Sequence, residues 1–82
     1  MGKLGSERQF DVALRGYDCD QVDEYLARLD AALLRLGAGE RVEAPPAAQF
    51  DVALRGYDRG QVDARIEQMT DVGRRLWQQF AP

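Results

Sequence analysis

The side chains able to act as nucleophiles or zinc ligands are few in this 82-residue chain, and this restricts its chemistry. There is no histidine, and Cys19 is the single cysteine. Serine–histidine and cysteine–histidine catalysis and zinc sites with imidazole ligands are therefore excluded. A lone cysteine also cannot form an intrachain disulfide. We expect a protein that is not an enzyme and that uses no cofactor.

Acidic residues are concentrated in one stretch of the first half, at Asp18, Asp20, Asp23 and Glu24. A divalent cation is one conceivable ligand, but the run lacks the glycine and the terminal bidentate glutamate of an EF-hand loop. Helix capping explains these acids better, because carboxylates at a helix start accept backbone N–H bonds and complement the helix dipole. We predict no metal site.

The charge balance argues against a nucleic-acid partner. Lysine and arginine number 11 against 14 aspartate and glutamate residues, which gives a net charge of −3. This is not the basic footprint of a nucleic-acid binder or of a polybasic membrane-surface protein. No apolar run approaches the roughly 20 residues of a membrane span, and no secretory signal follows the first methionine. The expected location is cytoplasmic.

An internal repeat organises the chain. Residues 9–18 and residues 49–58 have the same sequence, QFDVALRGYD, and further matches follow at the same offset of 40. Ten consecutive identities indicate a duplication. The sequence therefore predicts four parts: an N-terminal arm (1–8), a first repeat (9–36), a linker (37–48) and a second repeat (49–80).

Each repeat is expected to contain a short extended stretch, a turn and a helix. The extended stretch covers Phe10–Leu14 in the first copy. Gly16 and Gly56 are predicted to provide a turn conformation that other residues resist. Asp18 and Asp58 are predicted to cap the helices, each with a glutamine three residues later in a variant of the capping box.

Apolar residues recur every three or four positions in both expected helices, in the manner of a heptad seam. One position differs sharply, because Leu33 corresponds to Gly73. In a parallel pair these residues would meet in one layer, large against small. We therefore predict a mainly α fold whose helices pair as a short coiled coil, an intramolecular pseudo-dimer. About 12 extended linker residues reach about 40 Å, enough to return along a helix of roughly 27 Å. An antiparallel helical hairpin is the alternative.

The string F-x-x-x-L-R-G-Y-D-x-x-Q-V-D, present twice, resembles the N-terminal domain of the DivIVA/GpsB family of bacterial cell-division and polar-growth proteins. The resemblance covers residues 10–30 and 50–70. It implies a parallel dimer whose N-terminal segments cross. Here both halves lie on one chain, which implies a fused dimer.

The resemblance implies two kinds of site, of which the first is a membrane-binding tip. The matching residues are Leu14, Arg15, Leu54 and Arg55, with leucine in place of the family's aromatic, so insertion should be weaker. The alternative is that the leucines belong to the core and the arginines bind local carbonyl groups.

The second implied site captures arginine-containing tails of partner proteins. Tyr57, Asp63 and Glu67 match the family's groove in the second copy. The first copy matches at Tyr17 and Asp23, with Ala27 in place of the acid. The alternative is that both aspartates pair with the chain's own arginines, such as Arg15 and Arg55.

Trp77 stands where the first copy has Gly37 and extends the apolar face of the second helix together with Leu76 and Phe80. We expect it to close the core, with an exposed docking patch as the alternative.

These observations lead to a functional prediction: a protein-interaction module that docks a cytoplasmic partner of the division or growth machinery. That partner would carry an arginine-containing tail or another coiled coil. The alternatives are a membrane-associated scaffold subunit that assembles with longer coiled-coil relatives, and a small soluble subunit without a division role.

Overall fold

The fold was analysed in a computed structural model, which describes residues 9–43 and 45–80. The predicted N-terminal arm, residues 1–8, lies outside the described residues. Each repeat contributes one strand followed by one helix, and most of the described chain is helical. The elements, in chain order, are β1 (Val12–Tyr17), α1 (Cys19–Gly37), β2 (Val52–Tyr57), α2 (Arg59–Trp77) and a short 3-10 helix, η2 (Gln78–Phe80).

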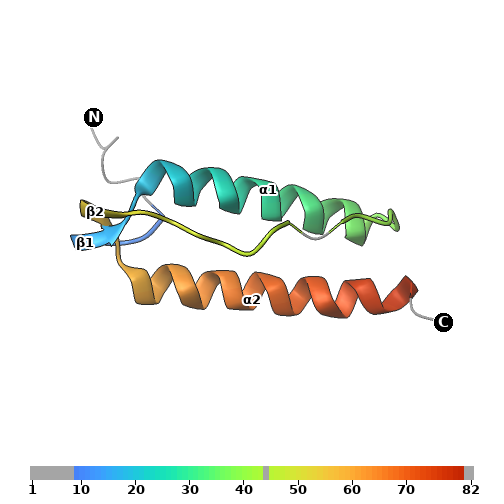
Figure 1. The fold of residues 1–82 in the computed structure, drawn as a ribbon. Helices are drawn as coiled ribbons and strands as arrows, with labels where there is room; N and C mark the ends of the chain where they lie inside the picture. Colours follow the sequence, from blue (N-terminus) through green and yellow to red (C-terminus); the bar gives the residue numbers. More distant parts are fainter. Residues whose placement is uncertain (1–8, 44, 81–82) are drawn as a thin grey trace, which may run out of the picture.

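The two helices contact each other and run side by side in the same direction (Figure 1). Both begin at the end of the molecule that carries the strands, and the linker returns from the end of α1 to the start of β2. The antiparallel hairpin is therefore not adopted. The linker can return because α1 stops in a Schellman motif, in which Glu40 N donates to Arg35 O and Gly39 takes a φ of 92°.

The strands pair antiparallel with each other, since partners run backward along β2 as β1 is followed forward, from Val12 opposite Tyr57 to Tyr17 opposite Val52. Hydrogen bonds from Asp18 N to Asp51 O (2.9 Å) and from Asp58 N to Asp11 O (2.8 Å) extend the ladder at both ends. Tyr17 also lies opposite Tyr57, where the strands cross.

The strand boundaries correct the sequence prediction. The extended segment was expected to end at Leu14, but β1 continues through Gly16 to Tyr17. The residues expected to form a turn lie within β1, where Arg15 alone among the described non-glycine residues has a positive φ, because the second copy of the same segment supplies their hydrogen-bonding partners.

The reason for the glycines also differs from the prediction, since neither Gly16 nor Gly56 has a positive φ. A Cβ atom on Gly16 would overlap the backbone carbonyls of Gly56 and Tyr57, and one on Gly56 would overlap those of Gly16 and Tyr17. Glycine is needed because two backbones cross in contact, and not for a turn.

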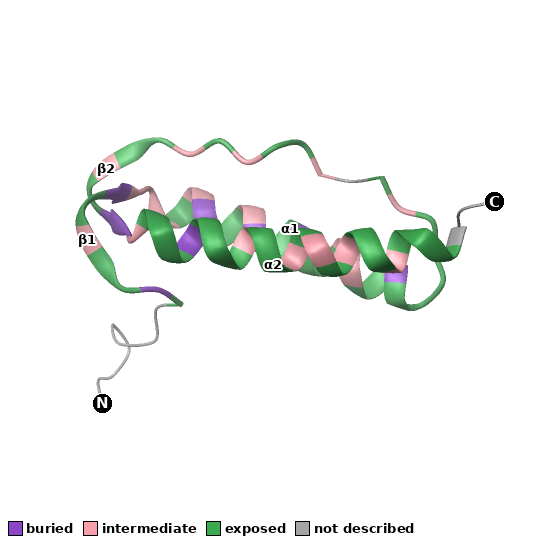
Figure 2. Cartoon of the chain, turned by 90° about the horizontal axis from the view of Figure 1, so that it is seen from below, coloured by how far each residue is buried: buried purple, intermediate pink, exposed green. Residues whose placement is uncertain are grey.

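The core is concentrated near the strands, as Figure 2 shows by its purple segments. Buried residues from both repeats form one cluster there: Phe10, Val22, Leu26, Tyr57 and Val62. Farther along the helices Leu29 and Leu36 are buried on α1, whereas Val62 is the one buried residue of α2 in the described part of the chain. The seam is therefore closed tightly at one end and less so at the other.

The Leu33–Gly73 layer lies in this looser part. A Cβ atom on Gly73 would be 3.2 Å from Leu33 Cδ2, so the leucine of one helix occupies the space left by the glycine of the other.

Candidate functional site

Near the strands, each repeat forms side-chain hydrogen bonds to the other repeat. Asp11 N donates to Gln61 Oε1 (2.9 Å) and Asp51 N donates to Gln21 Oε1 (2.8 Å). Each glutamine side chain also donates to the carboxylate of the same aspartate, at 3.0 Å in both cases. Every one of these bonds therefore joins one repeat to the other.

The capping boxes are only half formed for the same reason. Asp18 Oδ1 accepts from Gln21 N and Asp58 Oδ1 accepts from Gln61 N, both at 3.0 Å, so the aspartates cap their helices. The glutamine side chains do not return to the caps, because they bind the opposite repeat.

The tyrosines and aspartates of the predicted partner site are paired across the repeats as well. Tyr17 OH donates to Asp63 Oδ1 (3.0 Å), and Tyr57 OH donates to Asp23 Oδ1 (2.9 Å). The prediction grouped Tyr57 with Asp63, but it is Tyr17 that reaches this carboxylate. The alternative pairing with the chain's own arginines is also not found, since neither Asp23 nor Asp63 forms an ion pair among the described residues.

The first composite site, which we call the Asp63 site, consists of Tyr17, Asp63 and Glu67. Both carboxylates are exposed, and Glu67 has no hydrogen bond or ion pair within the described part of the chain. Burial raises the pKa of Tyr17 above its ordinary value of about 10, and the hydrogen bond and charge of Asp63 raise it further, against the opposing charge of Arg59. The phenol therefore stays protonated and donates to Asp63 at neutral pH.

Aromatic rings flank the Asp63 site. Phe50 packs against Tyr17 with a centroid distance of 5.1 Å and against Tyr25 at 5.6 Å. Tyr25 OH in turn donates to Pro46 O (2.9 Å), and this hydrogen bond holds the linker beside the aromatic rings.

The second composite site, which we call the Asp23 site, has different surroundings. Asp23 Oδ1 accepts from Gln9 Nε2 (3.2 Å) in addition to Tyr57, and Ala27 stands where the other site has Glu67. Tyr57 is only 2% exposed and packs edge-on against Phe10 at 5.1 Å. Arg65 lies over the Phe10 ring at 5.3 Å from its centroid.

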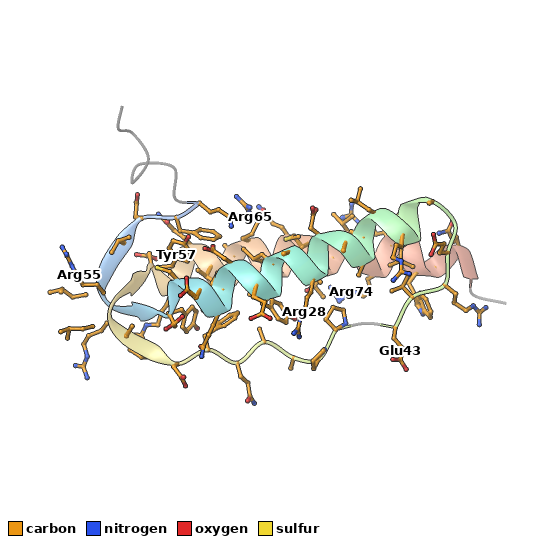
Figure 3. The ribbon with its side chains drawn as sticks, turned by 90° about the horizontal axis from the view of Figure 1, so that it is seen from above. Arg28, Glu43, Arg55, Tyr57, Arg65 and Arg74 are labelled. Carbon is orange, nitrogen blue, oxygen red and sulfur yellow. The ribbon has the colours of Figure 1, made fainter. Side chains whose placement is uncertain are left out.

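The four predicted tip residues lie together at the strand end. Leu14 and Leu54 are 75% and 77% exposed, so the alternative that they belong to the core is wrong. Leu14 is opposite Arg55 in the sheet, and Figure 3 shows Arg55 pointing away from the body of the molecule. Neither tip arginine forms an ion pair with any described residue. Arg15 has a φ of 59°, in the left-handed region that non-glycine residues seldom adopt.

Trp77 lies at the opposite end and does not close the core as expected. Its side chain is 42% exposed and contacts Arg41 of the linker, whose guanidinium is 5.9 Å from the ring centroid. It borders an apolar groove of about 610 Å³ between the linker and the distal halves of both helices, where Leu33 and Gly73 also lie.

Several residues of these sites were missed by the sequence reading. Gln21 and Gln61 were read only as capping partners, and Gln9, Phe50 and Arg65 received no role. The three glutamines and Phe50 have identical counterparts in the other repeat, which was the available signal. The sequence of one repeat alone does not indicate which residues of the other repeat these side chains contact.

The chain matches no family model, no curated protein and no solved structure. In the described residues, neither helix has the length and apolar character needed to cross a bilayer. The same residues contain no cluster of three or more acidic or cysteine side chains arranged to hold a metal ion.

Proposed function

We propose that this chain is a non-enzymatic docking module, a single-chain counterpart of the DivIVA/GpsB-type dimer. Its two repeats would form an intramolecular pseudo-dimer with a short parallel coiled coil. The reciprocal Gln–Asp and Tyr–Asp bonds support this view, because identical segments of two separate chains would exchange the same contacts. The partner would be a cytoplasmic protein of the bacterial division or growth machinery.

The observation that carries the docking proposal is the pair of exposed carboxylates at the Asp63 site. Tyr17 holds Asp63 in place, while Glu67, one helical turn away, has no partner in the described chain. Two carboxylates on one helix face can bind both edges of a guanidinium, which a lysine ammonium cannot match. The proposed ligand is therefore an arginine-containing segment.

A peptide-binding experiment with a charge-reversal variant tests this function. A fluorescently labelled peptide with one arginine among glycines is titrated with the protein at low salt, with its lysine version for comparison. Glu67→Lys should abolish the arginine preference while the fold remains intact, since Glu67 is exposed and has no hydrogen bond or ion pair in the described structure. Asp30→Lys makes the same charge change at an exposed position of α1 and serves as control. Equal binding by wild type and Glu67→Lys would refute the proposal.

A second function, weak contact with anionic membranes, is favoured by the exposed tip. Two apolar side chains and two arginines without ion pairs lie at one end of the molecule. Each arginine near an anionic surface contributes about 1 kcal/mol, so two give a marginal, salt-sensitive attachment.

Co-sedimentation with vesicles tests the tip. Arg15→Glu combined with Arg55→Glu should remove binding to phosphatidylserine-containing vesicles, and neutral vesicles should bind neither protein. Arg74→Glu combined with Arg75→Glu makes the same charge change at the far end of α2. If both double variants bind equally, net charge and not the tip determines the binding.

A further inference from the structure

The two repeats contact each other through surfaces that are complementary whether or not both repeats belong to one chain. We infer that two copies of this chain join by exchanging repeats at high concentration, and that the Leu33–Gly73 layer restricts the exchange to unlike repeats. In the exchanged pair, the first repeat of each copy packs on the second repeat of the other. This inference concerns a second copy of the chain and is independent of the proposed arginine-containing partner.

The strand end does not distinguish like from unlike repeats. Its Gln–Asp and Tyr–Asp hydrogen bonds cross between the repeats and occur twice, with the same residue types on both sides. The two paired strands, Val12–Tyr17 and Val52–Tyr57, also have one sequence. Two first repeats from separate copies would therefore find the same partners here as a first and a second repeat. The strand end favours pairing but does not select the partner.

The far end does distinguish them, first through the Leu33–Gly73 layer. A Cβ atom on Gly73 would already lie 3.2 Å from Leu33 Cδ2, so a second leucine does not fit beside Leu33 without repacking. Because parallel helices bring equivalent positions into one layer, two first repeats would place leucine against leucine. Two second repeats would place glycine against glycine and leave a cavity. Unlike repeats are the combination that fills the layer.

A hydrogen bond at the same end adds to this selection. Gln79 Nε2 donates to Leu36 O of the opposite repeat at 2.8 Å. The position equivalent to Gln79 in the first repeat is Gly39, which has no side chain and lies beyond the end of α1 with a φ of 92°. A pair of first repeats would therefore lack the donor of this bond, whereas every unlike pair contains it.

The linker determines how strongly closure within one chain is preferred to exchange. It runs from the end of α1 back beside the helices to the start of β2 (Figure 1), and Tyr25 OH holds it through Pro46 O. A short linker gives one repeat an effective concentration of about 1 mM near the other, so closure is favoured about tenfold at about 0.1 mM protein. Near about 1 mM the exchanged form becomes comparable. Each Asp63 site of that form takes Tyr17 from one copy and Asp63 from the other.

Refolding of the wild-type chain at two concentrations tests the exchange. The full chain is refolded from urea at about 0.02 mM and at about 1 mM, below and at the effective concentration of closure, and its mass is measured by sedimentation velocity. We expect single chains at the lower concentration and a substantial fraction of two-chain particles at the higher one. Single chains at both concentrations would overturn the inference.

An isotope-filtered nuclear Overhauser experiment on the two-chain fraction identifies which repeats pair. Carbon-13-labelled and unlabelled wild-type chains are refolded together at the higher concentration. Contacts between the Leu33 methyl protons of one copy and the Gly73 α protons of the other are expected. Contacts between the Leu33 methyl groups of two copies would demonstrate like pairing and would overturn the selection by this layer.

Two complementary variants test the layer directly. Leu33→Gly makes both positions of the layer glycine, and Gly73→Leu makes both leucine, so neither variant fills its layer correctly by itself. Refolded together at about 0.1 mM, they should form a particle with one copy of each, about tenfold in excess over particles with two copies of either, because every glycine then meets a leucine. Native mass spectrometry separates these particles, since the two variants differ in mass.

A matched control uses the next position of the helices. Leu34 and Arg74 are equivalent and exposed, so a mixture of Leu34→Gly and Arg74→Leu should form no excess of mixed particles. Folded Leu33→Gly and Gly73→Leu chains that do not combine would overturn the selection by the layer. If either variant fails to fold alone, folded protein should be recovered on mixing, and failure to recover it would overturn the selection as well.

Discussion

The hydrogen bonds at the strand end are matched between the two repeats, whereas the packing at the far end of the helices is not, although both ends derive from one duplicated unit. At the strand end the Gln–Asp and Tyr–Asp bonds each have a reciprocal bond 40 residues away, and the distances agree within 0.1 Å, as for the two Tyr–Asp bonds at 3.0 and 2.9 Å. At the far end Leu33 faces Gly73, and Leu36 is buried whereas Leu76 is half-buried.

The difference teaches what each region requires of the sequence. Backbone crossing and exchanged hydrogen bonds depend on the geometry of both copies, so residues 9–18 and 49–58 remain identical. Packing between the two helices depends mainly on the total side-chain volume in each layer, so a large residue on one helix can face a small residue on the other. Substitutions at equivalent positions should therefore have equal effects near the strands and unequal effects far from them.

The largest effect is expected at the crossing of the strands. Gly16→Ala and Gly56→Ala should each destabilise the fold by about 3 kcal/mol or more, because the added methyl group overlaps backbone atoms that cannot move independently. Thermal unfolding followed by circular dichroism measures this. Two melting temperatures close to the wild-type value would show that the strands can separate without cost.

The matched control lies at the far end. A Cβ atom on Gly37 has no neighbour within 4 Å, and alanine favours the helix over glycine by about 1 kcal/mol. Gly37→Ala should therefore leave the melting temperature unchanged or raise it, so the same chemical change has opposite signs at the two ends.

A smaller but still clear effect is expected from truncating the seam. Leu36→Ala should cost about 2–3 kcal/mol, because Leu36 is buried, and Leu76→Ala should cost about 1 kcal/mol, because Leu76 is only half-buried. Urea denaturation of both variants gives the two free energies of unfolding. Equal costs would mean that the far end is as symmetric as the strand end.

Equal effects are expected for the exchanged glutamines. Gln21→Ala and Gln61→Ala each remove two exposed hydrogen bonds to the opposite aspartate, so each should cost about 1 kcal/mol. The same urea experiment applies. Costs that differ by more than about 1 kcal/mol would contradict the reciprocity of the strand end.

Much of the helical part of this fold could be predicted from local sequence. Asp18 and Asp58 mark the helix starts because a cap acts on backbone groups two or three residues away. The seam spacing likewise placed Leu33 against Gly73, since a parallel pair brings equivalent positions into one layer.

The strands and the site pairing could not be predicted, for a physical reason. Each tyrosine has two equivalent aspartates to bind, one in its own repeat and one in the other, and identical sequences contain no preference between them. Tertiary geometry decides in favour of Tyr17 with Asp63. The antiparallel pairing of β1 with β2 could not be predicted for the same reason, because nothing in the sequence of one repeat indicates that its strand will pair with the strand of the other.

The smallest effect concerns the ionisation of Tyr17, which tests how closely the two halves are joined at the Asp63 site. Burial is the main cause of its raised pKa, followed by the hydrogen bond and charge of Asp63. Because folding favours the neutral phenol, its contribution to stability is complete below the ordinary pKa near 10 and is lost as pH rises through the higher value of the folded chain. Carbon-13 resonances of the tyrosine rings follow this titration. Asp63→Asn should lower the pKa of Tyr17 while leaving it above the ordinary value, since burial remains. An unchanged pKa in this variant would mean that Asp63 and Tyr17 do not interact across the repeats in solution.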